Sequence, residues 1–298
     1  MKAIILAGGA GSRLYPLTNV ITKQLQPVYD KPMIYYPISF LMNAQIKDIL
    51  IISTKEDGPS FKKFLGDGKK LGISIQYKIQ EKPTGIPQAF IIGEDFIGNE
   101  DIVLLLGDNI FYGDNSFFIK AIDSHEVKAN GVHARVFAYA VSDPERYGVV
   151  EFDRKTGGVL SIEEKPEKPR SKFAIPGLYL FDNSVINRTK KLRPSNRRET
   201  EITDLIESYF KEGKLGVEII ERGIAWLDAG TPKSLLEASS FISAIEQRQG
   251  LKVACLEEMA FRNKFINFKQ FNELVETLPK CPYREYLEEI IEDLKYEY

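Results

Sequence analysis

Cysteine and histidine are scarce in this sequence. Its 298 residues contain only four residues of these two types, namely Cys255, Cys281, His125 and His133. Two cysteines are too few for a disulfide scaffold, so we expect a reducing, cytoplasmic environment. Neither cysteine stands in a motif typical of a catalytic thiol, and neither histidine stands in a metal-ligand spacing. The sequence therefore does not indicate thiol or zinc chemistry.

A strong net charge and a long apolar run are missing as well. The formal net charge is −2, so no overall basic surface indicates binding to nucleic acid or to a membrane. No run approaches the length of a transmembrane helix, and the apolar start at Ala3–Ala7 is too short for the apolar part of a signal peptide. The composition is typical of a globular protein, and the length allows one large α/β domain or two small ones.

The most informative stretch is the first one. Ala3–Ala7 is a short apolar run that predicts a buried strand, and it leads directly into a glycine-rich loop that contains Gly8, Gly9 and Gly11. A loop with so few side chains can bring several backbone N–H groups close to a phosphate. Two cations that suit an anionic ligand follow the loop, Arg13 and Lys23.

Two better-known phosphate loops do not match this stretch. The P-loop has a lysine directly after its last glycine, whereas Gly11 is followed by Ser12. The dinucleotide fingerprint needs a third glycine where this chain has Leu14, which weakens the alternative of a dinucleotide-dependent oxidoreductase. For the loop taken alone, a plain strand and turn with incidental glycines is the simplest alternative.

Apolar strands alternate with helices in the first half of the chain. We expect strands at 48–53, 73–79 and 101–106, and helices at 32–43, 60–65 and 87–96. Continuous apolar strands separated by helices predict an α/β fold with a Rossmann-like, mainly parallel sheet and helices on both faces. Ligands of such sheets bind at the carboxyl ends of the strands, and the glycine loop and Asp108 both stand at such ends.

The second half has shorter segments. We expect an added β-rich part with strands at 134–140, 148–152, 159–163, 174–181, 217–220 and 225–227. A helix at 201–211 has Thr200 as its predicted N-cap. Thr231 and Pro232 predict the start of a long helix that runs to about Gln247. The chain ends in a predicted helical tail at 256–298, broken near Pro279 and Pro282.

Two carboxylates stand at the ends of apolar strands, Asp108 and Asp228. Carboxylates from two distant segments can hold one Mg²⁺, a hard ion that prefers oxygen ligands and bridges phosphates. The alternative role of each aspartate is turn formation or helix capping.

The sequence resembles one enzyme family over nearly its whole length. Residues 6–16, L-A-G-G-A-G-S-R-L-Y-P, and residues 23–32, K-Q-L-Q-P-V-Y-D-K-P, resemble the signature of the sugar-1-phosphate nucleotidylyltransferases. The family usually has threonine where this chain has Ser12, so a hydroxyl group is retained. G-D-N at 107–109 and W-L-D-A-G at 226–230 resemble the metal motifs of the family, which implies Mg²⁺ bound by Asp108 and Asp228.

The resemblance also implies a division of the chain and its site. It implies a core at 1–240, with about 1–130 binding the nucleotide and about 131–230 the sugar, and a helical oligomerisation or regulatory segment at 241–298. The implied nucleotide-binding residues are Gly8, Gly9, Gly11, Ser12, Arg13, Gln24, Gln80, Pro83, Gly85 and Asp108. The implied sugar-phosphate-binding residues are Asn109, Tyr147, Gly148, Glu163, Lys165, Tyr179 and Trp226, with Glu163 on the sugar hydroxyls and Lys165 on the phosphate.

The implied reaction is nucleotidyl transfer. The phosphate of α-D-glucose 1-phosphate would attack the α-phosphorus of dTTP and give dTDP-glucose and pyrophosphate, a first step towards dTDP-L-rhamnose or other dTDP-sugars. The attacking group is already an anion, so the protein's role is positioning and charge stabilisation. The implied catalytic residues are Arg13, Lys23, Asp108, Lys165 and Asp228. The alternatives are a uridylyl- or cytidylyltransferase and a non-catalytic nucleotide-sugar sensor, and the intact catalytic set argues against the sensor.

The tail carries many apolar residues, and the sequence leaves open whether they pack on the core or in a subunit interface. The resemblance to the short-form members of the family implies a homotetramer with feedback inhibition by dTDP-L-rhamnose. Residues 254–262 match the region of the family involved, with Glu257 and Arg262 as regulatory candidates.

Overall fold

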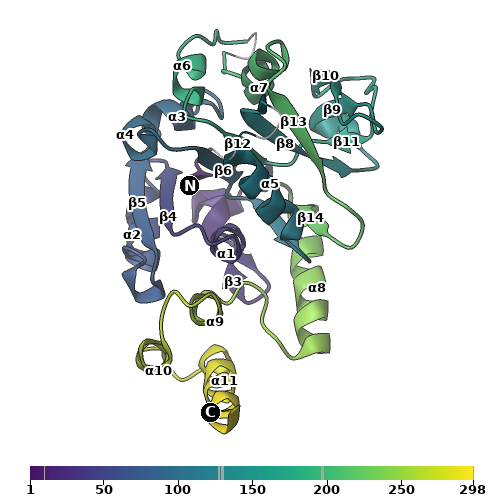
Figure 1. Ribbon diagram of the computed structural model, residues 1–298. Coiled ribbons are helices and arrows are strands. Elements are labelled where there is room, and N and C mark those ends of the chain that lie inside the picture. Colours follow the sequence, from purple (N-terminus) through teal and green to yellow (C-terminus); the bar gives the residue numbers. More distant parts are fainter. Residues whose placement is uncertain (10, 127, 129–130, 196–197, 298) are drawn as a thin grey trace.

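The fold is built on one ten-stranded mixed sheet (Figure 1). The computed structural model describes residues 1–9, 11–126, 128, 131–195 and 198–297. The strands of the sheet are β1 (Lys2–Ala7), β4 (Asp48–Ser53), β5 (Ser74–Ile79), β6 (Ile102–Leu106), β8 (Ala134–Ala140), β9 (Gly148–Phe152), β10 (Val159–Glu164), β11 (Phe173–Ala174), β12 (Leu178–Phe181) and β13 (Leu215–Ile219).

Most of the central strands run in one direction. The strand order is β10-β9-β11-β8-β12-β6-β1-β4-β5, and β13 lies beside β8. The pairs of β1 with β4 and β6, of β4 with β5, and of β8 with β13 are parallel, whereas β12 runs antiparallel between β6 and β8. The strands of the second half thus extend the sheet of the first half, and the predicted mainly parallel α/β fold is confirmed.

Helices cover both faces of the sheet because its central strands are apolar on both sides. In β1, Ile4 contributes to the core on one face and Ile5 to the core on the other, and both are fully buried. The first face packs against α3 (Gln88–Ile92), α4 (Glu94–Ile97), α6 (Val185–Thr189) and α7 (Ile202–Phe210). The second packs against α1 (Tyr35–Asn43), α2 (Gly58–Leu65) and α5 (Ser116–Glu126).

A smaller apolar cluster forms outside the two faces of the sheet. It joins residues of the β2–β3 hairpin, of the β7–β14 pair and of the long helix α8. These elements are β2 (Pro27–Val28), β3 (Lys31–Pro32), β7 (Asn109–Tyr112), β14 (Ala225–Asp228) and α8 (Pro232–Gln249). The helix begins as the sequence predicts, because the Thr231 hydroxyl and the Ser234 side chain cap each other's backbone N–H groups.

The C-terminal tail packs on α1 and ends farthest from the sheet (Figure 1). Its helices are α9 (Leu256–Arg262), α10 (Phe268–Glu276) and α11 (Pro282–Glu297). Phe271 and Leu287 are fully buried in the same core as β1, whereas Leu251 and Phe268 are 51% and 40% exposed. Much of the apolar surface of the tail is therefore covered by the chain itself.

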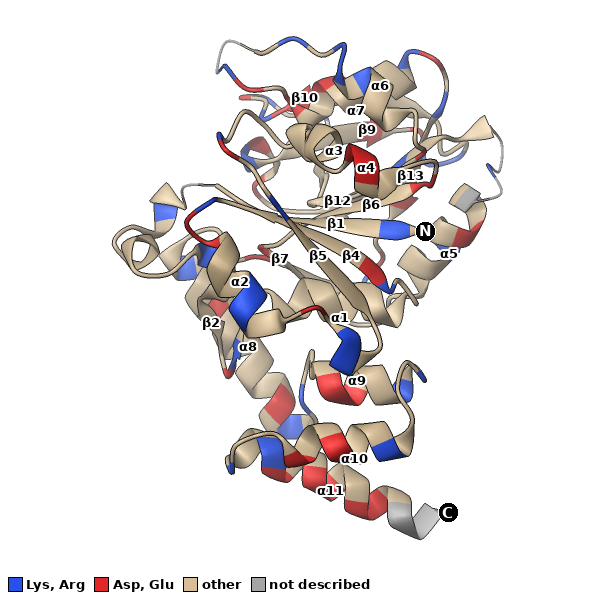
Figure 2. Cartoon of the chain, turned by 90° about the vertical axis from the view of Figure 1, so that its left-hand side faces the viewer, with Lys and Arg blue, Asp and Glu red and all other residues tan. Residues whose placement is uncertain are grey.

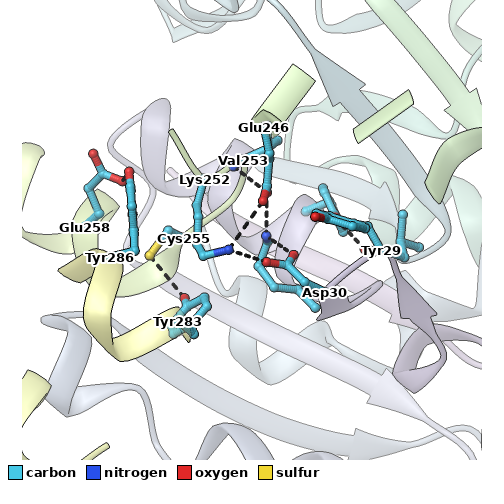
Figure 3. A network of polar contacts seen from close by, with 12 residues as sticks. Tyr29, Asp30, Glu246, Lys252, Val253, Cys255, Glu258, Tyr283 and Tyr286 are labelled. Atoms are coloured by element: carbon cyan, nitrogen blue, oxygen red, sulfur yellow. Dashed lines mark hydrogen bonds and ion pairs between the residues drawn. The ribbon is translucent and has the colours of Figure 1, made fainter. Parts of the chain in front are cut away.

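A cluster of four charges, two of them buried, which we call the tail network, ties the tail to the β2–β3 hairpin (Figure 3). Lys31 forms ion pairs with Asp30 and, at 2.7 Å, with Glu246 near the end of α8. Lys252, at the start of the tail, pairs with the same two carboxylates, Asp30 and Glu246. The Lys31 and Glu246 side chains are only 2% and 6% exposed, so both are removed from water and each has an opposite charge beside it.

Acidic and basic residues are mixed along α9, α10 and α11 (Figure 2). None of the described helices is long and apolar enough to cross a membrane.

Three local predictions need correction. Thr200 does not cap α7, because its hydroxyl and backbone N–H both donate to the Thr84 carbonyl; Glu201 occupies the cap position. The predicted strand at 174–181 is divided in two around Pro176, which lacks an N–H group. The elements β7, α5 and α6 were not predicted.

The implied division of the chain stays a prediction. The border at residue 240 falls within α8, which is continuous from Pro232 to Gln249. Tyr298, the last residue of the predicted tail, lies outside the described residues.

Candidate active site

A cavity of about 650 Å³ lies next to the carboxyl ends of β1 and β6. Ser12 and Arg13, which follow the glycine loop directly, form one part of its wall, and Asp108 and Asp228 line it as well. The remaining predicted residues in its wall are Asn109, Tyr147, Gly148, Lys165, Tyr179 and Trp226. The cavity therefore brings together residues that the sequence analysis assigned to the nucleotide, the metal and the sugar phosphate.

The β7–β14 pair brings the two aspartates together. Asp228 ends β14 and lies opposite Asn109, the first residue of β7, so Asp108 is beside it. The backbone N–H of Ala229 donates to the Asp108 carbonyl at 3.4 Å. Because the pair is fixed by backbone hydrogen bonds, the two carboxylates are held close even before any ligand binds.

Asp108 has a cation as its partner. Its carboxylate forms an ion pair with the Lys23 ammonium, whose side chain is 8% exposed, and accepts a hydrogen bond from Asn109 Nδ2 at 2.9 Å. Burial alone would raise the pKa of Asp108, but the Lys23 charge and the hydrogen bonds outweigh it, so the pKa lies below its usual range. Asp108 is therefore ionised at neutral pH.

Asp228 is less well compensated. Burial raises the pKa of this carboxyl and the neighbouring Asp108 charge raises it further, although Lys23, Arg13 and Arg146 act in the opposite direction. The Arg146 guanidinium is 3.7 Å from Asp228 Oδ2, beyond a direct hydrogen bond. A raised pKa means that the negative charge of Asp228 is poorly compensated. A cation that binds beside the two carboxylates would therefore be stabilised by them.

The donor set fits Mg²⁺. The described residues contain no cluster of three or more metal-ligating side chains. Two carboxylates nevertheless suffice for Mg²⁺, which binds through one or two carboxylates and completes its shell with water and substrate phosphates. Asp108 and Asp228 supply such oxygens at the wall of an open cavity.

Asn109 holds this part of the site together. Its Oδ1 accepts hydrogen bonds from the Trp226 indole at 2.7 Å and from the Gly177 backbone N–H at 2.9 Å. Its Nδ2 donates to Asp108, so three segments meet at one side chain that is 4% exposed. These bonds give Asn109 a positioning role towards Asp108, and its predicted contact with the sugar phosphate stays a prediction.

The absence of a side chain at Gly230 allows Arg13 to lie beside Asp228. A Cβ atom at Gly230 would be 3.1 Å from Arg13 Nη2 and 3.0 Å from Asp228 Oδ1. Gly11 precedes the short turn of Arg13 with φ 56°, a left-handed conformation that glycine adopts without steric cost. The glycine loop thus directs a guanidinium into the cavity.

The sugar side of the cavity differs from the prediction by one residue. Glu164, not Glu163, lines the cavity, and it lies opposite Gly148 in the β9–β10 pair. Glu163 instead lies near Arg170, whose backbone N–H donates to its carboxylate at 3.3 Å. Successive side chains of a strand point to opposite faces, so Glu164 and not Glu163 faces the cavity, and the predicted contact of Glu163 with the sugar hydroxyls stays a prediction.

Lys165 stands at the end of the same strand with its side chain 51% exposed. Its ammonium is 3.5 Å from Glu164 Oε1 and lines the cavity. Tyr179 forms part of the floor, and burial raises the pKa of its hydroxyl, so it stays protonated at neutral pH. The site thus offers a half-exposed cation and a neutral hydroxyl to a ligand.

The predicted nucleobase residues lie apart from this wall. Gln24, Gln80, Pro83 and Gly85 are not among the described residues that line the cavity. Gln80 faces Gly8, since a Cβ atom there would be 2.8 Å from Gln80 Oε1. Gly85 packs on Thr200, whose carbonyl would be 2.0 Å from a Cβ atom at Gly85, so this glycine is required by packing. Ile86, which follows it, lines the cavity.

A second cavity of about 330 Å³ lies between the core and the tail. Glu258 and Met259 of α9 line it, together with Phe111 and Leu251. Glu257, the predicted regulatory residue, is directed away and accepts a hydrogen bond from the Tyr283 hydroxyl at 2.6 Å. The other candidate, Arg262, pairs with Glu258 at 2.6 Å. As with Glu163, the neighbour of the predicted glutamate faces the cavity.

Sequence reasoning missed four polar residues in the wall of the first cavity, Arg146, Glu164, Glu199 and Thr203. Arg146 precedes the predicted Tyr147, and its guanidinium is 2.6 Å from Asp143. The alternation of β10 could have indicated Glu164, because its cross-strand partner Gly148 was predicted. The other residues come from loops and a helix start whose positions only the fold defines.

Known proteins resemble the chain over nearly its full length. Residues 2–245 match the family model described as nucleotidyl transferase. A glucose-1-phosphate thymidylyltransferase of Neisseria meningitidis is 53% identical over 96% of this chain and 98% of its own, and one of Neisseria gonorrhoeae is 52% identical over 98% and 99%. A Bacillus anthracis crystal structure assigned to the same activity has a TM-score of 0.75 and 40% identity, covering 91% of this chain and 99% of its own.

Proposed function

The chain belongs to the nucleotidyl transferase family, and on that premise we propose that it transfers the thymidylyl group of dTTP to α-D-glucose 1-phosphate, giving dTDP-glucose and pyrophosphate. The names of relatives that are about half identical over nearly the whole chain support this choice of substrates. Uridylyl and cytidylyl transfer are not favoured, because the relatives named here are thymidylyltransferases.

One observation in the molecule carries the proposal. A pair of carboxylates, Asp108 and Asp228, lies in one cavity wall with the cations Arg13 and Lys165. A triphosphate and a sugar phosphate bring several negative charges to one place, and the cations can bind them. The carboxylates would repel those phosphates unless a divalent cation lies between them, so both kinds of charge are consistent with a metal–nucleotide complex.

The phosphate of glucose 1-phosphate would attack the α-phosphorus, and pyrophosphate would leave in line. We propose that Arg13 and the backbone N–H groups of the glycine loop bind the β- and γ-phosphates. Lys23, which is paired with Asp108, would remain close enough to stabilise charge at the α-phosphate. The attacking oxygen is an anion from the outset, so positioning and charge stabilisation are the main contributions of the protein.

Mg²⁺ would be held by Asp108 and Asp228, and when bound it would neutralise and orient the triphosphate. Asn109 would keep the Asp108 carboxylate in position through its hydrogen bond. The poorly compensated charge of Asp228 favours cation binding, and its β14 backbone is fixed by pairing with β7.

On the sugar side, we propose that Lys165 binds the phosphate of glucose 1-phosphate and that Glu164 accepts hydrogen bonds from sugar hydroxyls. Gly148 would allow the sugar to approach the backbone, with Tyr147 and Tyr179 as aromatic walls. The cavity volume of about 650 Å³ is in the range of small-ligand sites, which supports simultaneous binding of a sugar and phosphates.

Pyrophosphate release with dTTP and glucose 1-phosphate in the presence of Mg²⁺ tests the function. We expect turnover with both substrates, loss of turnover with EDTA, and weaker discrimination between dTTP and dUTP than between dTTP and dCTP, because one methyl group contributes little selectivity. If neither pyrophosphate nor dTDP-glucose forms when dTTP, glucose 1-phosphate and Mg²⁺ are all present, the proposal is overturned.

We further propose a cytoplasmic homotetramer that uses the tail as an interface and is inhibited by dTDP-L-rhamnose in the second cavity. Its support is the cavity of about 330 Å³ beside Glu258 and the exposed apolar residues Leu251 and Phe268. Light scattering at micromolar concentration gives the oligomeric state. A monomer that dTDP-rhamnose still inhibits would contradict the interface account. Point variants are preferable to truncation at Gln249, which would expose the core that Phe271 and Leu287 complete.

A further inference from the structure

The Arg146 guanidinium lies between two carboxylates and is shared unequally by them. Arg146 ends the short helix η6 (Pro144–Arg146). Its Nη1 donates to Asp143 Oδ2 at 2.6 Å, whereas its Nη2 is 3.7 Å from Asp228 Oδ2. The first distance is that of a charge-assisted hydrogen bond and the second is too long for one. Asp143 therefore holds the guanidinium, and Asp228 lies beside it without a direct bond from it.

Aromatic side chains place this arginine close to Asp228. The guanidinium is 5.2 Å from the centre of the Tyr147 ring, within the range of a cation–π contact. Tyr147 packs on Trp226 with ring centres 5.0 Å apart, and Trp226 stands two residues before Asp228 in β14. The Arg146 side chain is 41% exposed, so it has room to turn. A small rotation of this side chain would be enough to bring the guanidinium onto Asp228.

A direct bond between Arg146 and Asp228 would obstruct a metal site. A guanidinium can engage both oxygens of a carboxylate in a bidentate pair. A metal cation would then have to displace this positive charge before it could reach the Asp228 oxygens. Asp228 lines the cavity with Asp108, whereas Asp143 is not among the described residues that line it. Asp143 is thus placed to act on the site from outside the cavity, through the arginine that it binds.

We propose that Asp143 is a positioning residue of the metal site, which holds Arg146 away from Asp228 so that Asp228 stays open to a divalent cation. The inference rests on the proposed function, in which Asp108 and Asp228 bind Mg²⁺. Asp143 acts through Arg146 and needs no contact with the cation or with a substrate. Loss of Asp143 and loss of Arg146 should therefore change cation binding in opposite directions, which a role in folding alone would not produce.

Binding of Mn²⁺ to the nucleotide-free protein, followed by the electron paramagnetic resonance signal of the free ion, tests this. Asp143→Ala frees the guanidinium to pair with Asp228, so we expect the Mn²⁺ dissociation constant to rise by about 10-fold, the low end for a hydrogen bond between charged groups. Arg146→Gln removes the competing cation, and the constant should fall by about twofold to fivefold, as for one partly exposed charge.

The double variant separates positioning from charge. In Asp143→Ala/Arg146→Gln no guanidinium is left to be held, so its Mn²⁺ dissociation constant should stay within about twofold of that of Arg146→Gln. Glu145→Ala is the matched control, because Glu145 is an exposed residue of η6 and the same negative charge is lost. Its constant should stay within about twofold of that of the unaltered protein. Thermal unfolding checks that each variant folds, and Asp143→Asn, with a weaker acceptor, replaces Asp143→Ala if that variant does not.

An unchanged dissociation constant in folded Asp143→Ala would overturn the inference. Equal weakening by Asp143→Ala with and without Arg146 would also overturn it, because Asp143 would then act by its charge alone. If no variant binds Mn²⁺ without nucleotide, the Mg²⁺ concentration for half-maximal turnover decides, with the same directions expected and no shift as the contrary result. Failure of the proposed function would show differently, as absence of dTDP-glucose with the unaltered protein.

Discussion

Two clusters of charged side chains in this molecule differ in how their carboxylates are paired with cations. In the tail network, the carboxylates of Asp30 and Glu246 face two ammonium groups that each pair with both. In the candidate active site, Asp108 has Lys23 as a partner but Asp228 has no cation within direct hydrogen-bond distance among the described residues. The balanced cluster stabilises the fold, whereas the unbalanced one leaves negative charge available for a ligand.

The pKa directions agree with this difference. Burial would raise the pKa of Asp30, but hydrogen bonds from Lys252 and Lys31 lower it below the usual value. Burial and the charge of Asp108 raise the pKa of Asp228. A carboxyl with a lowered pKa stabilises the folded state at neutral pH, and one with a raised pKa destabilises it. Binding sites often carry such a cost in stability.

The largest effect is expected from Asp108→Asn. Loss of this carboxylate should lower kcat by about 10³-fold or more, comparable to the loss of a main electrostatic contact in other active sites. It should also lower the free energy of unfolding, because it leaves Lys23 buried without its charge partner. Steady-state kinetics and urea unfolding measure both effects, with the exposed Asp123→Asn as control. Wild-type turnover in the variant would contradict the assignment.

Breaking the tail network should give the next largest effect, on stability alone. Glu246→Gln leaves Lys31 with one carboxylate partner in place of two, and loss of a hydrogen bond between charged groups costs about 1.5–3 kcal/mol. We expect a fall of that order in the free energy of unfolding, with near-normal kcat in the protein that stays folded. Glu237→Gln, at an exposed position of the same helix, should cost less than about 0.5 kcal/mol. Equal losses in both would show that the network does not stabilise the fold.

Lys165→Ala should affect one substrate only. We expect affinity for glucose 1-phosphate to fall by about 10-fold to 100-fold, the range for one charge-assisted contact, and affinity for dTTP to stay within about twofold. Calorimetric titration with each ligand measures this. Equal losses for both ligands would assign Lys165 another role, and Lys155→Ala, on an exposed turn, is the control.

A smaller, pH-dependent effect is expected at His125, which is fully buried. Burial and Lys128 lower its pKa from 6.5 to about 4, although Asp101 raises it. Between pH 6.5 and about 4, His125 binds a proton in the unfolded chain but not in the folded chain. The free energy of unfolding should therefore fall as the pH decreases through this range. The slope from one such group is at most about 1.4 kcal/mol per pH unit.

His125→Phe should remove this part of the pH dependence between pH 6.5 and 4. Urea unfolding at several pH values, with His133→Phe for comparison, measures the slope. An unchanged slope in His125→Phe would mean that other groups, such as the carboxylates, cause the loss of stability in acid.

The fold was largely predictable because apolar runs and glycines define the strands of the parallel part. The runs at 48–53 and 101–106 correspond closely to β4 and β6, and the Thr231–Pro232 helix start is confirmed. β7 was not predicted, since its short segment Asn109–Tyr112 forms a strand only through pairing with β14. The same pairing places Asp228 beside Asp108, which the sequence indicates only as two separate strand ends.

The direction of individual side chains was harder to predict from the sequence than the strands and helices. Glu163 and Glu257 were each predicted one residue away from the glutamates that line the cavities, Glu164 and Glu258. Two adjacent glutamates have the same propensities, and only strand pairing or helix packing decides which one faces inward.

The unfolding free energy and the turnover of Asp228→Asn, measured together, test the difference between the two clusters most directly. Removal of this charge relieves its repulsion from Asp108 and its cost of burial. The variant should therefore be more stable than the unaltered protein in urea at pH 7 and should lose most of its Mg²⁺-dependent thymidylyl transfer. A variant that is less stable, or that turns over at the wild-type rate, would contradict the account of Asp228 as a carboxylate held for a cation.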